Sequence, residues 1–65
     1  MKDIITINSK WKHKDGDSYI IDDIMVAQHY ETLIWYKKIY KDKNSVGTRT
    51  FCRTASHFLE SFTKE

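Results

Sequence analysis

One stretch, Ala27–Tyr40 (A-Q-H-Y-E-T-L-I-W-Y-K-K-I-Y), limits what this chain can fold into more than any other. It holds the densest apolar and aromatic content of the sequence and has no Gly or Pro to interrupt it. Because aromatic and β-branched residues favour strands, we expect the central strand of a small sheet here. A helix is the alternative, since the stretch is long enough, but its weak 3.6-residue periodicity and missing C-terminal cap favour the strand.

The later part of this stretch, Leu33–Tyr40, is apolar on both faces of the predicted strand. Side chains alternate between the faces of a strand. One face would carry Leu33, Trp35, Lys37 and Ile39, and the other Ile34, Tyr36, Lys38 and Tyr40. A half-buried antiparallel strand normally has one polar face. We therefore expect one face to line the core and the other to contact a ligand, a partner protein or a second copy of the chain.

The small size of the chain also points to association. Its 65 residues make a single domain, residues 1–65, and a domain of this size buries only about 60% of the surface that its unfolded chain exposes. The only cysteine, Cys52, excludes an internal disulfide, and the widely separated histidines lack zinc-ligand spacing. We expect no metal and no cofactor, and we predict a homo-oligomer, most simply a dimer.

Charge and hydropathy narrow the class of protein further. The formal net charge of +2, with charges of both signs mixed along the chain, makes a nucleic-acid partner less favoured than a protein or a small ligand. No run of residues is long and apolar enough to cross a membrane, and no secretory signal is visible. Together with a lone cysteine, these features predict a cytoplasmic protein with no membrane partner.

Turn signals divide the remainder into short strands. Asp15-Gly16 before Tyr19 predicts a hairpin, because Gly accepts the positive φ of a tight turn. Ser18–Val26 is a second strand, in which the adjacent carboxylates Asp22-Asp23 predict a bulge or bend. A cation site is the alternative reading of that pair, although two carboxylates supply too few ligands. Lys41–Ser45 is a polar turn, and Ser45–Arg53 is a further strand in which Gly47 predicts a bulge.

The C-terminal part predicts a short helical turn. Thr54 or Ser56 would cap it, and Phe58, Leu59 and Phe62 would then point together into one open end of the sheet. Thr63–Glu65 is expected to fray. The predicted fold is therefore mostly β: a small, strongly bent antiparallel sheet or SH3-like barrel of four to five strands with a short C-terminal helical turn.

Three motifs of the chain resemble a known family. They are W-K-H-K-D-G-D-S-Y, A-Q-H-Y-E-T-L-I-W-Y-K-K-I-Y and F-C-R-T-A-S-H-F-L-E, and together they span Trp11–Glu60. The pattern is similar to the DUF1653 family of small bacterial and phage proteins, with Phe51-Cys52-Arg53-Thr54 where that family has W-V-R-P. The family is uncharacterised, so the resemblance implies a compact, mostly β fold and no particular reaction.

The polar residues suggest one candidate binding site. His29 and Glu31 lie two residues apart on the predicted central strand, His13 belongs to the first hairpin, and Arg49 and Arg53 belong to the C-terminal strand. We expect His13, His29, Glu31, Arg49 and Arg53 to form a small anion-binding pocket around Trp35 and Tyr36. Arg supplies a planar fork that matches phosphate or carboxylate, and aromatic rings can stack a base. The alternative for Glu31 and Arg53 is a structural pair across the sheet.

No catalytic constellation is recognisable. The sequence lacks the nucleophile-elbow, phosphate-loop and zinc-protease motifs and has no paired catalytic carboxylates. Arg49 and Arg53 could lower the pKa of Cys52 and make it a nucleophile, but the residue reads more simply as a small core side chain. We therefore expect a protein that is not an enzyme.

Three functions remain open. The first is a non-enzymatic, homo-oligomeric module that recognises or sequesters a small anionic, nucleotide-like ligand. The second is a phage-type inhibitor or adaptor that docks on a host protein through exposed aromatics. The third is single-stranded nucleic-acid binding on the sheet, which the weak net charge disfavours.

Overall fold

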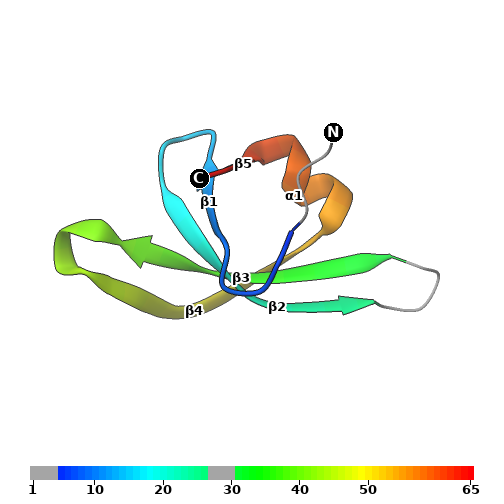
Figure 1. The fold of residues 1–65 in the computed structure, drawn as a ribbon, viewed down its shortest axis with the longest axis horizontal. Coiled ribbons are helices and arrows are strands. Elements are labelled where there is room, and N and C mark those ends of the chain that lie inside the picture. Colours follow the sequence, from blue (N-terminus) through cyan, green and yellow to red (C-terminus); the bar gives the residue numbers. More distant parts are fainter. Residues whose placement is uncertain (1–4, 27–30) are drawn as a thin grey trace.

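The computed structural model describes residues 5–26 and 31–65. Within them the elements follow in the order β1 (Lys10–His13), β2 (Ser18–Val26), β3 (Thr32–Tyr40), the short 3₁₀ helix η2 (Lys41–Lys43), β4 (Ser45–Thr54), α1 (Ala55–Ser61) and β5 (Phe62–Lys64), as Figure 1 shows. The mostly β fold predicted from the sequence is therefore confirmed.

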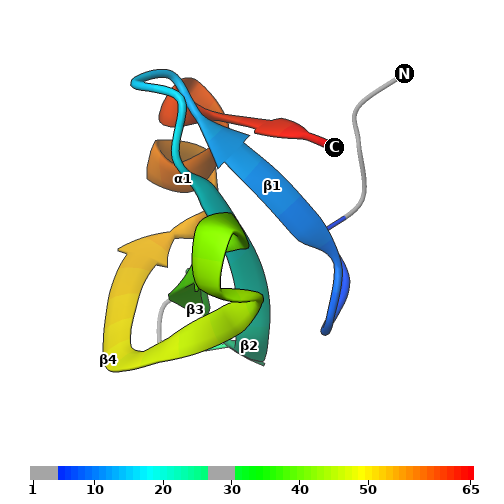
Figure 2. The ribbon, with the colours of Figure 1, turned by 90° about the vertical axis from the view of Figure 1, so that its left-hand side faces the viewer.

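The strands form one antiparallel sheet in the order β4-β3-β2-β1-β5. The sheet is strongly bent, and α1 lies against its concave side (Figure 2). Among the described residues no pairing joins the two edge strands, β4 and β5, to each other. The sheet is thus an open, bent one, the first of the two predicted forms, and helix α1 covers its hollow.

The predicted hairpin connects β1 and β2. Gly16 takes a φ of 106°, which lies in the region that favours glycine. The backbone N–H of Gly16 donates to the carbonyl of His13 at 2.9 Å, and the N–H of His13 donates to the carbonyl of Asp17 at 2.8 Å. The Asp-Gly pair in the sequence therefore marks this turn correctly.

A bulge interrupts β2 at the acidic pair. Ile21 pairs with Tyr36, whereas Asp23 pairs with Trp35, so Asp22 is the extra residue. This insertion allows Ile21 and Ile24 to face the same side although they lie three residues apart. Asp22 and Asp23 are exposed, and no group of three or more metal-ligating side chains occurs in residues 5–26 or 31–65. The prediction of a solvated bulge is confirmed.

Strand β3 lies in the interior of the sheet, between β2 and β4. Ile34 and Tyr36 are buried on its concave face, and Leu33, Trp35 and Ile39 are partly exposed on its convex face. The concave face of β3, with Ile34 and Tyr36, is therefore the one that lines the core. Residues 27–30, with which the predicted strand began, lie outside the described part of the chain.

The turn after β3 and the start of β4 also follow the predicted pattern. Asn44 ends η2 in the left-handed region with a φ of 50°, and β4 begins at the next residue. The register of β4 against β3 shifts between Lys37 and Ile39, opposite Gly47. A Cβ at Gly47 would lie 2.9 Å from the Tyr40 ring, so the bulge uses a glycine to let that ring approach.

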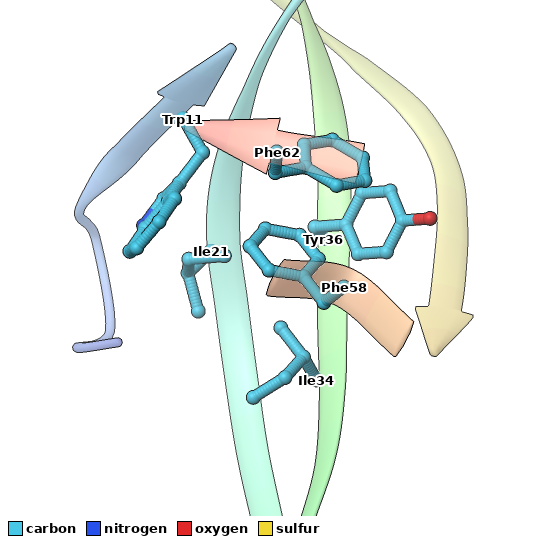
Figure 3. Packing of buried hydrophobic residues seen from close by; sticks show 6 residues of the cluster. All are labelled: Trp11, Ile21, Ile34, Tyr36, Phe58 and Phe62. Carbon is cyan, nitrogen blue, oxygen red and sulfur yellow. The ribbon is translucent and has the colours of Figure 1, made fainter. Parts of the chain in front are cut away.

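The core fills the concave side of the sheet with large side chains from β1, β2, β3, β5 and α1 (Figure 3). Its buried members are Trp11, Ile21, Ile34, Tyr36, Phe58 and Phe62. Thr54 caps α1 by accepting a hydrogen bond from the His57 N–H at 3.3 Å, as expected. Leu59, however, is 39% exposed, so the prediction that it joins Phe58 and Phe62 in the core is wrong.

The last residues form a strand, which corrects the expected frayed end. β5 pairs with β1, with Phe62 opposite His13 and Lys64 opposite Trp11. Phe62 is buried and holds the strand in this position. The side chain of Glu65 adds an ion pair with Lys41, with Oε1 3.4 Å from Nζ. Hydrogen bonding to the Ser18 hydroxyl, followed by the effects of Lys41, lowers the pKa of Glu65 below its ordinary value.

Candidate functional site

The structure separates the two aromatic residues that were expected to share one pocket. Trp35 and Tyr36 are neighbours in β3, so their side chains lie on opposite faces of the sheet. Tyr36 belongs to the concave core, whereas Trp35 lies on the convex face. The predicted seven-residue site is therefore divided between two surfaces.

The concave side brings together an aromatic cluster whose rings come from β2, β3, β4 and β5. Tyr36 and Phe51 stack with centroids 5.6 Å apart, and Tyr19 packs edge-on against both at 5.4 Å and 6.0 Å. Phe62 contacts Tyr19 and Tyr36 at 5.3 Å and 5.2 Å. Tyr19, Phe51 and Phe62 were not in the predicted site. Phe51 could have been found, because strand alternation places it on the same face as Arg53.

Both arginines of the predicted site lie on this cluster. The guanidinium carbon of Arg49 is 5.9 Å from the centre of the Phe51 ring, and that of Arg53 is 5.8 Å from the centre of the Phe62 ring. In the described part of the chain neither arginine forms an ion pair with a carboxylate. We call the set Tyr36, Arg49, Phe51, Arg53 and Phe62 the arginine–aromatic surface.

Burial sets the protonation state of the tyrosine in this surface. Tyr36 is 4% exposed, and desolvation raises the pKa of its hydroxyl above the ordinary value of 10.0. The nearby positive charge of Arg53 and a hydrogen bond between the two side chains act in the opposite direction and are weaker. The hydroxyl is therefore neutral at physiological pH.

His13 contacts the same Phe62 ring as Arg53. Its imidazole lies edge-on to Phe62 with centroids 4.8 Å apart. Its Nδ1 lies 3.0 Å from an Asp15 carboxylate oxygen and 3.2 Å from the Asp15 backbone nitrogen. The Asp17 N–H and, more weakly, His13 lower the pKa of Asp15. Beside His13 an open depression of about 410 Å³ runs along the hairpin turn to Thr63.

Glu31 does not join the arginines. It lines a separate, shallow depression of about 260 Å³ together with Thr32, Thr54, Ala55 and Ser56. Arg53 is opposite Ile34 in the sheet register, and no Glu31–Arg53 ion pair occurs in residues 5–26 and 31–65. The structural pair that was the alternative for these two residues is therefore not formed either. His29 lies outside the described residues.

The convex face carries a second set of side chains around Trp35. Trp35 is opposite Asp23 on one side and Cys52 on the other, and Met25, which is 50% exposed, is opposite Leu33. Cys52 is exposed, so the prediction that it is a small core residue is wrong. Strand alternation explains the error, because the residue follows the inward-facing Phe51.

The depressions of the described surface are open and shallow rather than enclosed, with volumes of about 260 to 410 Å³. No helix in the described part of the chain is long and apolar enough to cross a membrane. Comparison with protein-family models, with curated proteins and with solved structures finds no significant match. The function therefore has to be argued from the arginine–aromatic surface and from the two faces of the sheet.

Proposed function

We propose that this protein is a non-enzymatic binding module that recognises a small anionic, nucleotide-like ligand on its arginine–aromatic surface. The observation that carries the proposal is the position of Arg49 and Arg53. Both guanidinium groups lie over aromatic rings and are held without an ion-pair partner in the described residues.

The chemistry of these groups matches an anion that has a planar part. Guanidinium groups donate paired hydrogen bonds to phosphate or carboxylate, and they are weakly hydrated, so binding costs little desolvation. The Arg53 guanidinium already packs on the Phe62 ring, 5.8 Å from its centre, which lowers the ordering cost of binding. Phe51 and Tyr19 are only partly buried and offer ring surface at the edge of the cluster.

The rest of the proposal concerns assembly and cellular context. We propose that the protein acts as a homo-oligomer in the cytoplasm and is a divergent DUF1653 relative. The marginal size of its core supports the oligomer, because six buried apolar side chains form the described core. Analytical ultracentrifugation and native mass spectrometry would measure the oligomeric state and any small molecule that copurifies.

A nucleotide panel tests the binding. Mono-, di- and triphosphates of adenosine and guanosine, with inorganic phosphate, would be added in a thermal-shift assay, and positive cases would be titrated by calorimetry. We expect at least one nucleotide to raise the melting temperature, because a ligand that binds only the folded state stabilises it. Arg53→Ala should remove that shift, and Arg53→Lys should restore it only in part, since Lys cannot form the paired contact.

A matched control separates specific binding from general attraction between opposite charges. Lys43→Ala removes the same charge from the exposed turn, where the ammonium lies 6.0 Å from the Tyr40 ring. This variant should keep the nucleotide shift. If Lys43→Ala and Arg53→Ala weakened binding equally, or if no nucleotide shifted the wild-type protein, the proposal would fail.

The convex face favours a second candidate function, docking on a host protein. Trp35 and Leu33 lie beside the half-exposed Met25 there, and aromatic residues and Met are enriched in protein interfaces. Affinity capture would support this function if one host protein bound stoichiometrically and Trp35→Ala released it while the nucleotide shift was retained. Nucleic-acid binding would instead weaken steeply with salt in an oligonucleotide titration.

A further inference from the structure

We propose that β4 pairs with β4 of a second copy of this chain, antiparallel about a two-fold axis at Cys52, and that this pairing completes the anion site. Arg53 and Phe51 from both copies would then line one continuous concave surface. The identity of the ligand rests on the function proposed above, whereas the strand pairing is argued and tested independently of it.

The edge of β4 is available for pairing. β4 is the outermost strand on one side of the sheet and contains 10 residues, whereas β5 at the other edge has three. Its second half, Thr50–Thr54, keeps a regular register against β3, beyond the bulge near Gly47. A regular exposed edge presents a row of unpaired backbone groups, which is a template for another strand.

The side chains of this segment are complementary to those of the same segment in a second copy that runs antiparallel to it. The sequence T-F-C-R-T, read antiparallel about Cys52, places Thr50 opposite Thr54, Phe51 opposite Arg53 and Cys52 opposite Cys52 of the second copy. Cross-strand Thr pairs and cation–aromatic pairs are both favourable. No carboxylate and no directly opposed like charges occur in this segment. The regular half of β4 is therefore compatible with itself.

Alternation then decides what each face of the joined sheet presents. The Thr and Cys side chains lie on the convex face, and Phe51 and Arg53 lie on the concave face of each copy. The two Arg53 residues would occupy diagonal positions, at about 7–8 Å between their Cα atoms. Like charges at that spacing repel one another, and an anion held between them would offset the repulsion.

This geometry links association to binding. An anion that contacts both Arg53 side chains binds the dimer better than the monomer, so it must also strengthen the dimer by the same factor. The proposal therefore predicts that the apparent affinity for nucleotide rises with protein concentration.

Cys52 makes the pairing directly measurable in the wild-type chain. Directly opposed residues of an antiparallel pair have Cα atoms about 4.5–5.5 Å apart, which lies within the range that a disulfide spans. Mild copper–phenanthroline oxidation at micromolar protein concentration should convert the protein into a Cys52-linked dimer, visible on a non-reducing gel and by intact mass spectrometry. Since Cys52 is the sole cysteine, no other disulfide can form.

Placing the cysteine elsewhere tests the register. In a Cys52→Ser background, Thr50→Cys and Thr54→Cys should crosslink to each other in a mixture faster than either crosslinks to itself. Thr63→Cys, on the exposed edge strand β5, measures the crosslinking of random collisions. The proposal is overturned if Cys52 crosslinks no faster than this control. It is also overturned if Thr50→Cys and Thr54→Cys crosslink to each other no faster than each crosslinks to itself.

The same assay with adenosine triphosphate as the probe separates this inference from the proposed function. We expect the probe to raise the Cys52 crosslinking rate about 5-fold or more, at the lower end of usual coupling between sites. A thermal shift without Cys52 crosslinking would overturn the strand pairing and leave the binding function intact. If Cys52 crosslinks but no nucleotide in the panel accelerates the reaction, the shared anion site is overturned, although the β4–β4 dimer is supported.

Discussion

The Phe58 and Phe62 rings lie parallel, with centroids 4.0 Å apart and planes 3° apart. The pair spans the junction between α1 and β5, so it fixes the helix over the sheet and the final strand beside β1. Trp11 and Tyr36 pack edge-on against Phe58 at 5.4 Å and 5.3 Å. The stack is therefore the point where the helix, the last strand and the concave face of the sheet meet.

Truncating one ring of this stack should be severely destabilising. Phe58 is fully buried, and Phe→Ala in a packed core typically costs about 3–5 kcal/mol. In a domain of this size we expect Phe58→Ala to leave little cooperative unfolding in a urea titration. Leu59→Ala, on the same helix but 39% exposed, is the matched control and should cost far less. Equal losses for the two variants would contradict the described orientation of α1.

The bulge at Asp22 gives a second prediction. Deleting Asp22 should move one half of β2 to the wrong face, because a one-residue change of register inverts the alternation of side chains. Either Ile21 or Ile24 would leave the core, and we expect the urea concentration at the midpoint of unfolding to fall strongly. Asp22→Ala keeps the residue and removes only an exposed ion pair with Lys37 at 3.7 Å, so it should change stability by less than about 1 kcal/mol. A well-tolerated deletion would contradict the bulge.

The turn at Gly16 gives a third prediction. Its φ of 106° is unfavourable for any residue with a Cβ, although nothing lies within 4 Å of the position that a Cβ would take. Gly16→Ala should therefore lose about 1–3 kcal/mol from backbone strain alone, without a steric clash. Thermal unfolding followed by circular dichroism would measure the loss. Lys14→Ala in the same exposed turn is the control and should have almost no effect.

Glu65 gives a prediction that depends on pH. Because its carboxylate accepts a hydrogen bond from Ser18 and pairs with Lys41, its pKa in the folded protein lies below the ordinary 4.5. The contribution of Glu65 to the free energy of unfolding is therefore complete above pH 4.5, and it is lost as the pH falls through the lower pKa of the folded protein. Glu65→Gln should be less stable than wild type at pH 7, and the difference should shrink below about pH 4.5 in urea titrations. A constant difference down to strongly acidic pH would contradict this assignment.

The sequence predicted the elements of the fold well where local chemistry decides them. Asp15-Gly16 defines a turn by backbone conformation, and two adjacent carboxylates in an apolar strand require a bulge or a bend. The strand bounds of β2 and the end of β3 at Tyr40 follow from such signals. These features depend on neighbours in the sequence, which are visible without a structure.

The parts that were missed depend on partners far apart in the chain. β5 is only three residues long and carries little intrinsic strand signal, and it becomes a strand because β1 is free to pair with it. Similarly, the choice between the faces of β3 depends on where α1 packs. For this reason Trp35 and Tyr36 were assigned to one site although they lie on opposite faces, and the cluster around Tyr19, Phe51 and Phe62 was overlooked.

The pairing of β1 with β5 has a consequence for the order in which the domain can fold. Trp11 and Phe58 touch in the core although most of the domain separates them in sequence. Domains dominated by such distant contacts close a long loop before the core gains stability, so they fold more slowly than helical domains of similar size. We therefore expect the hairpins formed by β2, β3 and β4 to appear early and to remain incomplete until the C-terminal aromatic pair closes over them.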